Sequence, residues 1–320
     1  MKANNKFHQK KDNSKIEYSV VIPVYNSEHT LEELYHRLIS VFRTIKNSFE
    51  IIYVDDGSND TSWKKLEEIH KRDKRVKIIQ LTHNFGQHNA LMCGFHFVRG
   101  NYIITLDDDL QNPPEEIPKL VDKMKEGYDL VYGIYISKKH NRFRRLGSSL
   151  MQIVYKKYFH TNSIITNFRI IKRQITQRII DHDKSFVFMD GLLAWKTRDI
   201  GYIDVLHNER KYAQSGYKIK KLLTFSLNVI TNFSIFPLQI ASVLGLLFVF
   251  MGGVIAIFFF IKKILFHIPV ANFSTLIVAI TLLFISGIQL LTLGLIGEYL
   301  GRIYFNINKK PQYEIRKQLK

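Results

Sequence analysis

Apolar and polar positions over residues 17–132 follow two different periods, one typical of strands and the other of helices. Short β-prone runs that end in turn residues predict buried strands at 17–27, 49–54, 76–81, 102–106 and 130–132. Between them, helical spacing of apolar residues predicts helices at 31–42, 63–70, 88–98 and 115–126. Thr30 and Glu33 form a capping-box pattern at the first helix. This alternation predicts an α/β fold with a mainly parallel sheet.

The last third of the chain contains two apolar runs without any charge, at 238–261 and 273–297. Each is about 25 residues, or roughly 37 Å as a helix, which is enough to cross a hydrocarbon core about 30 Å thick. We therefore predict transmembrane helices at 237–263 and 272–298. Residues 216–236 have lysines at one end and apolar residues throughout, which fits either an interfacial amphipathic helix or a core helix.

The net charge of +18 and the pI near 9.7 indicate an anionic partner, and the apolar runs favour a membrane over nucleic acid. Lysines and arginines flank the two spans, which predicts a multi-pass cell-membrane protein with its large N-terminal part, 17–215, and both termini in the cytosol. Residues 1–16, which show no signal peptide, and 299–320 are expected to be basic tails. The single cysteine, Cys93, excludes an intrachain disulfide.

Acidic turns follow two of the predicted strands, with Asp55 and Asp56 after the second and 107–109 after the fourth. Because parallel sheets bind ligands beyond the carboxyl ends of their strands, we expect both turns at one edge. Crowded carboxylates favour a cation, and Mg²⁺ or Mn²⁺ on phosphates takes one or two carboxylates. A single acidic turn would fit a solvated loop equally well. Two acidic turns at one edge indicate a site for a nucleotide and a metal. The sequence has no glycine-rich phosphate loop, so we expect neither a P-loop site nor a dinucleotide site.

Longer motifs surround these turns: Val21-Ile-Pro-Val-Tyr-Asn26, Val54-Asp-Asp-Gly-Ser58, Asn84-Phe-Gly86 and Asp107-Asp-Asp-Leu-Gln-Asn-Pro-Pro-Glu115. On these motifs the chain resembles the inverting glycosyltransferases of family 2, which have the GT-A fold. Segments 84–94, 110–118 and 294–304 are similar to the polyprenyl-phosphate glycosyltransferases of that family, which carry two C-terminal transmembrane helices. The likeness extends from Tyr18 to about Tyr313.

The resemblance implies roles for individual residues. It places the nucleotide of a UDP-sugar at Pro23, Tyr25, Asn26, Asp55, Asp56, Asn84 and Gly86. Asp107 and Asp109 are implied as catalytic residues and as the ligands of Mg²⁺ or Mn²⁺. Asp108 also borders the nucleotide, but its position in the motif is variable, so we expect it to tolerate replacement.

A later family element appears as His207, Arg210, Ala213, Ser215 and Tyr217. The resemblance implies that Ser215 and Tyr217 border the donor and that Arg210 binds a phosphate of the donor or of the lipid, which suits a guanidinium. Arg144, in the basic group at 142–145, is implied to hold the lipid phosphate during catalysis.

Three residues depart from the family pattern. Ala213 replaces a glycine of the later element, and Asp190 stands where many relatives have a basic or apolar residue, which could alter donor choice. Asn167 stands where relatives usually carry an acid, and a neutral amide cannot act as a general base.

The resemblance implies transfer of a sugar from a UDP-sugar to a polyprenyl phosphate, such as undecaprenyl phosphate, at the cytosolic membrane face for cell-envelope modification. A phosphate acceptor is already an anion at neutral pH and needs no base. Two alternatives remain: a membrane adaptor that has kept the fold without activity, and a processive polysaccharide synthase, although the Gln-x-x-Arg-Trp element of that class is absent. The resemblance leaves a homo-oligomer open, and the sequence does not identify the sugar.

Overall fold

The computed structural model describes residues 16–135, 166–180, 188–208, 271–307 and 311–320, together with isolated positions between 243 and 261. The chain divides into two compact units, one of residues 1–215 with 311–320 and the other of residues 216–310. The sequence-based assignments for 1–15, Arg144, Arg210, Ala213, Ser215, Tyr217 and 216–236 lie outside the described residues.

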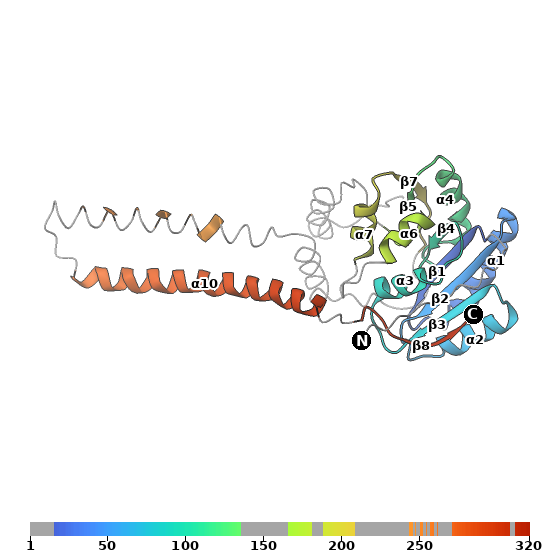
Figure 1. Ribbon diagram of the computed structural model, residues 1–320, viewed down its shortest axis with the longest axis horizontal. Coiled ribbons are helices and arrows are strands. Elements are labelled where there is room, and N and C mark those ends of the chain that lie inside the picture. Colours follow the sequence, from blue (N-terminus) through green and yellow to red (C-terminus); the bar gives the residue numbers. More distant parts are fainter. Residues whose placement is uncertain are drawn as a thin grey trace. The chain divides into compact units, whose positions relative to one another are not determined.

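The first unit is built on one eight-stranded sheet, in the order β7-β5-β6-β4-β1-β2-β3-β8 (Figure 1). The strands are β1 (Tyr18–Val24), β2 (Phe49–Asp55), β3 (Val76–Leu81), β4 (Tyr102–Thr105), β5 (Leu130–Tyr135), β6 (Arg169–Lys172), β7 (Ile200–Val205) and β8 (Ile315–Leu319). β1 runs parallel to β2 and β4, β2 to β3, and β5 to β7, whereas β6 and β8 are antiparallel to their neighbours. The predicted α/β fold with a mainly parallel sheet is confirmed.

Helices cover both faces of this sheet. They are α1 (Leu31–Ile45), α2 (Ser62–Arg72), α3 (Gln87–Phe95), the 3₁₀ turn η1 (Pro114–Glu116), α4 (Ile117–Met124), α6 (Arg173–Ile180) and α7 (Met189–Lys196). One core contains α1, α2 and α4 with Val20 and Ile22 of β1, and the other contains α3, α6 and α7 with Val21. Because neighbouring residues of β1 enter opposite cores, the strand is buried on both faces, and all of its residues except Ser19 are apolar or aromatic.

The first helix begins where the sequence predicted, but without the predicted capping box. Thr30 is the N-cap residue, and its side chain makes no capping hydrogen bond. Its hydroxyl instead donates to the backbone oxygen of Ser27 at 3.1 Å, and Glu33 forms an ion pair with Arg37 at 3.2 Å. The capping-box prediction is therefore wrong, because both side chains have other partners.

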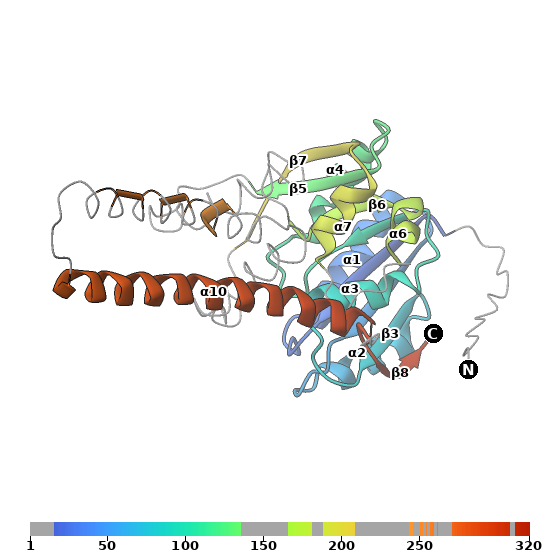
Figure 2. The same cartoon turned by 60° about the vertical axis from the view of Figure 1, so that its left-hand side comes forward.

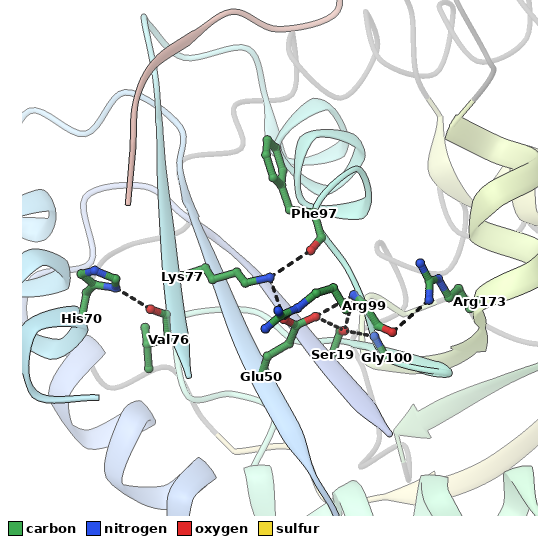
Figure 3. A network of polar contacts seen from close by, with 9 residues as sticks. All are labelled: Ser19, Glu50, His70, Val76, Lys77, Phe97, Arg99, Gly100 and Arg173. Carbon is green, nitrogen blue, oxygen red and sulfur yellow. Dashed lines mark hydrogen bonds and ion pairs between the residues drawn. The ribbon is translucent and has the colours of Figure 1, made fainter. Parts of the chain in front are cut away.

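A buried charge network joins the amino ends of the central strands, at the edge opposite the acidic turns (Figure 3). Glu50, 1% exposed, accepts hydrogen bonds from the Ser19 hydroxyl at 2.7 Å and from the Arg99 backbone N–H at 2.7 Å, and it pairs with Lys77 at 2.8 Å. Burial alone would raise the pKa of Glu50, but the charge of Lys77 and these hydrogen bonds hold it below its usual value. The network ties β1, β2 and β3 together through one carboxylate.

The described part of the second unit is mainly α10 (Ala271–Ile307), a helix of 37 residues. Among the described residues, its segment Phe284–Gly301 is the one helical stretch long and apolar enough to cross a membrane, and no part of it is buried. The second predicted span, 272–298, lies within α10, whereas most of the first, 237–263, lies outside the described residues.

Candidate active site

Four neighbouring strands bring their carboxyl ends to one edge of the sheet. These strands lie in the order β4-β1-β2-β3 and are all parallel, so the turns that follow them are adjacent (Figure 1). The turns carry the motif residues predicted for the site: Tyr25 and Asn26, Asp55 and Asp56, Asn84 and Gly86, and Asp107 to Asp109. The two acidic turns therefore share one edge, as the sequence predicted.

The turn after β2 is joined to the loop after β3. Both carboxylate oxygens of Asp56 accept backbone hydrogen bonds, from Phe85 at 2.7 Å and from Gly86 at 2.8 Å. Burial, only partly opposed by these bonds, raises the pKa of Asp56 to about 6. Gly57 has a φ of +70°, and a Cβ there would lie 2.6 Å from the backbone carbon of His83, so only glycine fits this approach.

Asp55 is fully buried and organises its own turn. Its oxygens accept hydrogen bonds from the Ser58 backbone N–H at 3.0 Å and from the Gln80 side chain at 3.1 Å. Asp55 therefore fixes the turn after β2 and ties it to β3 through Gln80.

The turn after β1 carries an exposed aromatic ring beside a left-handed residue. Tyr25 is 45% exposed, and Asn26 has a φ of 53°. The side-chain oxygen of Asn26 accepts a hydrogen bond from the Asn59 backbone N–H at 2.9 Å. The backbone N–H of Asn26 donates to the Ser58 hydroxyl at 2.9 Å. Pro23, also assigned to the nucleotide from the sequence, is a buried residue of β1, one position before the strand ends at Val24.

Asp108 connects the turns after β1 and β4. One of its oxygens accepts the backbone N–H of Tyr25 at 3.1 Å and also the hydroxyl of Ser27. These contacts argue against the expectation that Asp108 tolerates replacement, because its removal would release the turn that presents Tyr25. Asp108 is thus a residue that shapes the site by joining the turn after β4 to the turn after β1.

Asp107 is a carboxylate with two further carboxylates beside it. Burial, followed by the charges of Asp109 and Asp108, raises the pKa of Asp107 to about 7. The Gln87 side chain, at the start of α3, donates a hydrogen bond to Asp107 and partly opposes this shift. Sequence reasoning did not assign Gln87 to the site, although its place directly after the Asn84–Gly86 motif offered a signal.

These carboxylates fit a divalent cation that a bound diphosphate helps to hold. The described residues contain no group of three or more His, Cys, Asp or Glu side chains arranged around a metal position. Asp107 and Asp109 supply two hard oxygen donors, and their mutual repulsion would be relieved by a cation. Mg²⁺ and Mn²⁺ with phosphate oxygens as further ligands match this donor set.

The loop after the aspartates turns sharply into the core. Leu110 is 2% exposed and has a φ of 62°, a conformation that costs a side-chain-bearing residue about 1 kcal/mol or more. Arg37 of α1 holds the far end of the loop through Glu115, with Nε to Oε1 at 2.9 Å. Asn112 is also buried, and its side-chain amide has no hydrogen-bond partner among the described residues.

His207, the first residue of the later family element, lies next to this loop. The backbone N–H of Asn208 donates to Gln111 O at 2.9 Å, and the His207 ring stacks on Tyr135 at 3.9 Å between centroids. Burial lowers the pKa of His207, and the charge of Asp109 opposes that shift. Tyr135, at the end of β5, is a site residue that the sequence did not indicate.

A buried ion pair underlies the aspartates. Arg169, at the start of β6, lies in register with Thr105 of β4, and its guanidinium pairs with Asp190 of α7. The Arg169 Nε donates to the Thr105 hydroxyl at 3.2 Å, and that hydroxyl donates to the backbone oxygen of Asn167. Asp190 and Asn167, two of the three departures from the family pattern, therefore belong to one polar layer below the edge.

Comparison with known proteins places the chain in a family. Residues 19–193 match the sequence profile of glycosyl transferase family 2. An uncharacterized glycosyltransferase of Synechocystis sp. is 36% identical over 93% of this chain and 94% of its own length. Undecaprenyl-phosphate 4-deoxy-4-formamido-L-arabinose transferase of Proteus mirabilis is 37% identical over 93% of each chain.

Solved structures with a similar chain trace include glucosyl-3-phosphoglycerate synthase from Mycobacterium tuberculosis, crystallised with Mn²⁺, UDP and glucosyl-3-phosphoglycerate. It is 18% identical, covers 68% of this chain and 78% of its own, and gives a TM-score of 0.49. The profile match, over more than half of the sequence, and the relatives along nearly its whole length agree. The chain is a glycosyltransferase and belongs to glycosyl transferase family 2.

Proposed function

We propose that this glycosyltransferase moves a sugar from a UDP-sugar to a polyprenyl phosphate at a membrane surface. The observation that carries the proposal is the juxtaposition of the Asp55–Asp56 turn and the Asp107–Asp109 turn in a chain that also contains the apolar helix α10. The printed name of the Proteus mirabilis relative gives undecaprenyl phosphate as its acceptor, and the two chains match over 93% of their lengths.

The donor nucleotide is assigned to the edge formed by the turns after β1, β2 and β3. Tyr25 offers an exposed ring for a base, and Asn84 is exposed on the loop that Asp56 holds. Because Asp55 and Asp56 already accept hydrogen bonds from the protein, we assign them to the positioning of these loops. The Asn84 and Gly86 loop would then approach the ribose and diphosphate.

Asp107 and Asp109 are assigned as the ligands of Mg²⁺ or Mn²⁺. Such a cation, when bound, neutralises charge that develops on the departing diphosphate. The chain's contribution is to hold two carboxylates at the end of β4, with Gln87 fixing one oxygen of Asp107. His207 and Tyr135 enclose the Asp109 side of this turn.

A phosphate acceptor accounts for the lack of a general base at position 167. The second pKa of a phosphate monoester is about 6, so the attacking oxygen is an anion at pH 7 and needs no proton acceptor. Asn167 cannot remove a proton, and its backbone oxygen is occupied by the Thr105 hydroxyl. Arg210 and Arg144 remain our assignments for holding the acceptor phosphate in line with the anomeric carbon.

The membrane assignment rests on α10 and on the charge of the chain. Apolar side chains are exposed along this helix, including Leu282, Leu290 and Leu300 at 58–69%. A helix that is apolar on all sides is stable in lipid or in a protein core, and no part of the candidate segment is buried. We propose a multi-pass protein of the cell membrane whose catalytic unit and termini face the cytosol, as the basic flanks predict.

The proposal is tested by incubating the full chain in lipid nanodiscs with Mn²⁺, undecaprenyl phosphate and one UDP-sugar at a time. The mass of the glycolipid identifies the sugar, and undecaprenol serves as the matched acceptor without phosphate. We expect a product with the phosphate alone, because the alcohol requires a base. Equal transfer to undecaprenol, or no product with any nucleotide sugar, contradicts the proposal.

A further inference from the structure

The chain returns to the catalytic unit after its apolar helix. α10 ends at Ile307, and β8 begins at Ile315 and pairs antiparallel with β3, at the outer edge of the sheet (Figure 2). From its basic residues, the sequence predicted a cytosolic tail at 299–320, and residues Ile315–Leu319 of this stretch form β8. Ile315 and Leu319 instead pack against the two cores from the edge.

This C-terminal segment, residues 313–316, holds both backbone groups of Thr82. The Thr82 N–H donates to Glu314 O at 2.9 Å, and the Arg316 guanidinium donates to Thr82 O at 2.9 Å. The strand register shifts between Gln80 and Leu81, directly before this contact. Such irregularities re-aim the chain at the end of a strand.

Thr82 begins the loop that reaches the acidic edge. The four residues that follow it are His83, Asn84, Phe85 and Gly86. Asp56 fixes the far end of this loop through two backbone hydrogen bonds. The loop 83–86 is thus held at one end by the C-terminal segment and at the other end by Asp56, in the turn after β2.

A second contact reaches the helix that the loop leads into. Gly86 is the N-cap of α3, and the Tyr313 hydroxyl lies 3.0 Å from Nδ1 of His96, the C-cap of α3. Residues 313–316 therefore contact the stretch 82–96 at both of its ends. These contacts lie beyond the β3–β8 ladder, which ends at the pair Leu81 and Ile315.

We propose that Glu314 and Arg316 are positioning residues for the donor: they hold Thr82, and through it the loop 83–86, in the conformation that binds the nucleotide diphosphate. This inference rests on the proposed function, since it assigns the loop to the donor. It predicts that residues 313–316, which follow the apolar helix in the chain, affect the affinity for the donor although they do not contact it.

The inference is tested by measuring the Kd of UDP with Mn²⁺ by calorimetry, on the full chain in detergent micelles. Arg316→Ala is expected to raise this Kd about fivefold, the size of one lost charge-assisted hydrogen bond at the surface. Lys317→Ala is the matched control, because Lys317 is on the same strand but pairs with Glu67 at 2.6 Å and does not contact Thr82. Its Kd should stay within about twofold of the wild-type value. Tyr313→Phe, which removes only one hydroxyl, should raise the Kd by about twofold to threefold.

Steady-state kinetics separates positioning from general stability. Arg316→Ala should raise the KM for the donor and leave the KM for the lipid acceptor unchanged, with a melting temperature close to that of Lys317→Ala. Equal Kd values for the wild type and Arg316→Ala, or equal weakening by Arg316→Ala and Lys317→Ala, overturn the inference while the proposed function stands. A wild-type protein that does not bind UDP overturns the proposed function itself.

Discussion

Arg169 and Asp190 form an ion pair inside the catalytic unit, with the Arg169 side chain fully buried and that of Asp190 10% exposed. The guanidinium also lies over the Tyr132 ring at 5.7 Å, and its Nη2 has no hydrogen-bond partner among the described residues. Because Arg169 is level with Thr105, two residues before Asp107, this pair supports the aspartate turn from below.

We predict that Asp190→Asn destabilises the protein by about 3–5 kcal/mol, because it leaves a buried guanidinium without a counter-charge. Removing both charges, with Arg169→Met and Asp190→Leu, should recover most of this loss, since apolar residues of similar size can replace a buried pair. Thermal unfolding of the purified protein measures both effects. A melting temperature of Asp190→Asn within about 2 °C of the wild type would contradict the role of the pair.

Acid sensitivity is predicted from Glu50. Its pKa is held below its usual value in the folded protein, so its contribution to stability is present above pH 4.5 or so and is lost as the pH falls through the folded pKa. Glu50→Gln should lower the stability at pH 7 by about 3 kcal/mol, because Lys77 loses its partner. It should also reduce the fall in melting temperature as the pH drops below about 4.5.

The control for this change is Glu126→Gln, whose partner is Lys123 at 2.6 Å and whose side chain is 53% exposed. An exposed pair of this kind contributes little, so its melting temperature should hardly change. The same acid dependence in Glu50→Gln as in the wild type would show that another group controls it.

Gly57 tests the contact between the Asp55–Asp56 turn and the donor loop. Gly57→Ala combines an unfavourable φ with a Cβ only 2.6 Å from His83 backbone, and we expect a loss of about 3 kcal/mol or more together with weak UDP binding. Gly127→Ala is the matched control, because Gly127 has a φ of +110° but no atom within 4 Å of its Cβ position. It should cost about 1–2 kcal/mol from backbone strain and leave UDP affinity unchanged. Equal losses in the two variants would show that the approach to His83 has no role.

We predict that replacement of Asp108 lowers the activity without abolishing it. Asp108→Ala releases Tyr25 and Ser27, and we expect about tenfold lower activity, mainly through a higher KM for the donor. Asp122→Ala, on an exposed carboxylate of α4, should have no effect. Wild-type kinetics in Asp108→Ala would restore the original expectation that this position is tolerant.

Much of the first unit could be predicted from sequence because its central strands are buried on both faces. β3 begins and ends at the predicted residues, and the acidic pairs of the site stand directly at strand ends. β6 was missed because it begins with a charged residue, Arg169. Burial of this side chain is stabilised by its ion pair with Asp190, which lies 21 positions later in the sequence. No local pattern reports such a partner.

The contacts that shape the site could not be predicted from the sequence either. Asp108 and Tyr25 are 83 positions apart, and Arg316 and Thr82 are 234 positions apart. Residue type and spacing identified which carboxylates gather at the edge. They did not distinguish carboxylates that hold other loops, such as Asp56 and Asp108, from those that we assign to a cation. That division depends on backbone N–H groups of other loops.

The central claim is that Asp107 and Asp109 form the cation and diphosphate site of a lipid-phosphate glycosyltransferase. It is tested most directly by the rate of sugar transfer to undecaprenyl phosphate in nanodiscs with Mn²⁺, for the wild type and Asp109→Asn at saturating donor. We predict that Asp109→Asn lowers the rate by at least about a hundredfold while the melting temperature stays near the wild-type value. An Asp109→Asn protein that transfers sugar at the wild-type rate would contradict the account.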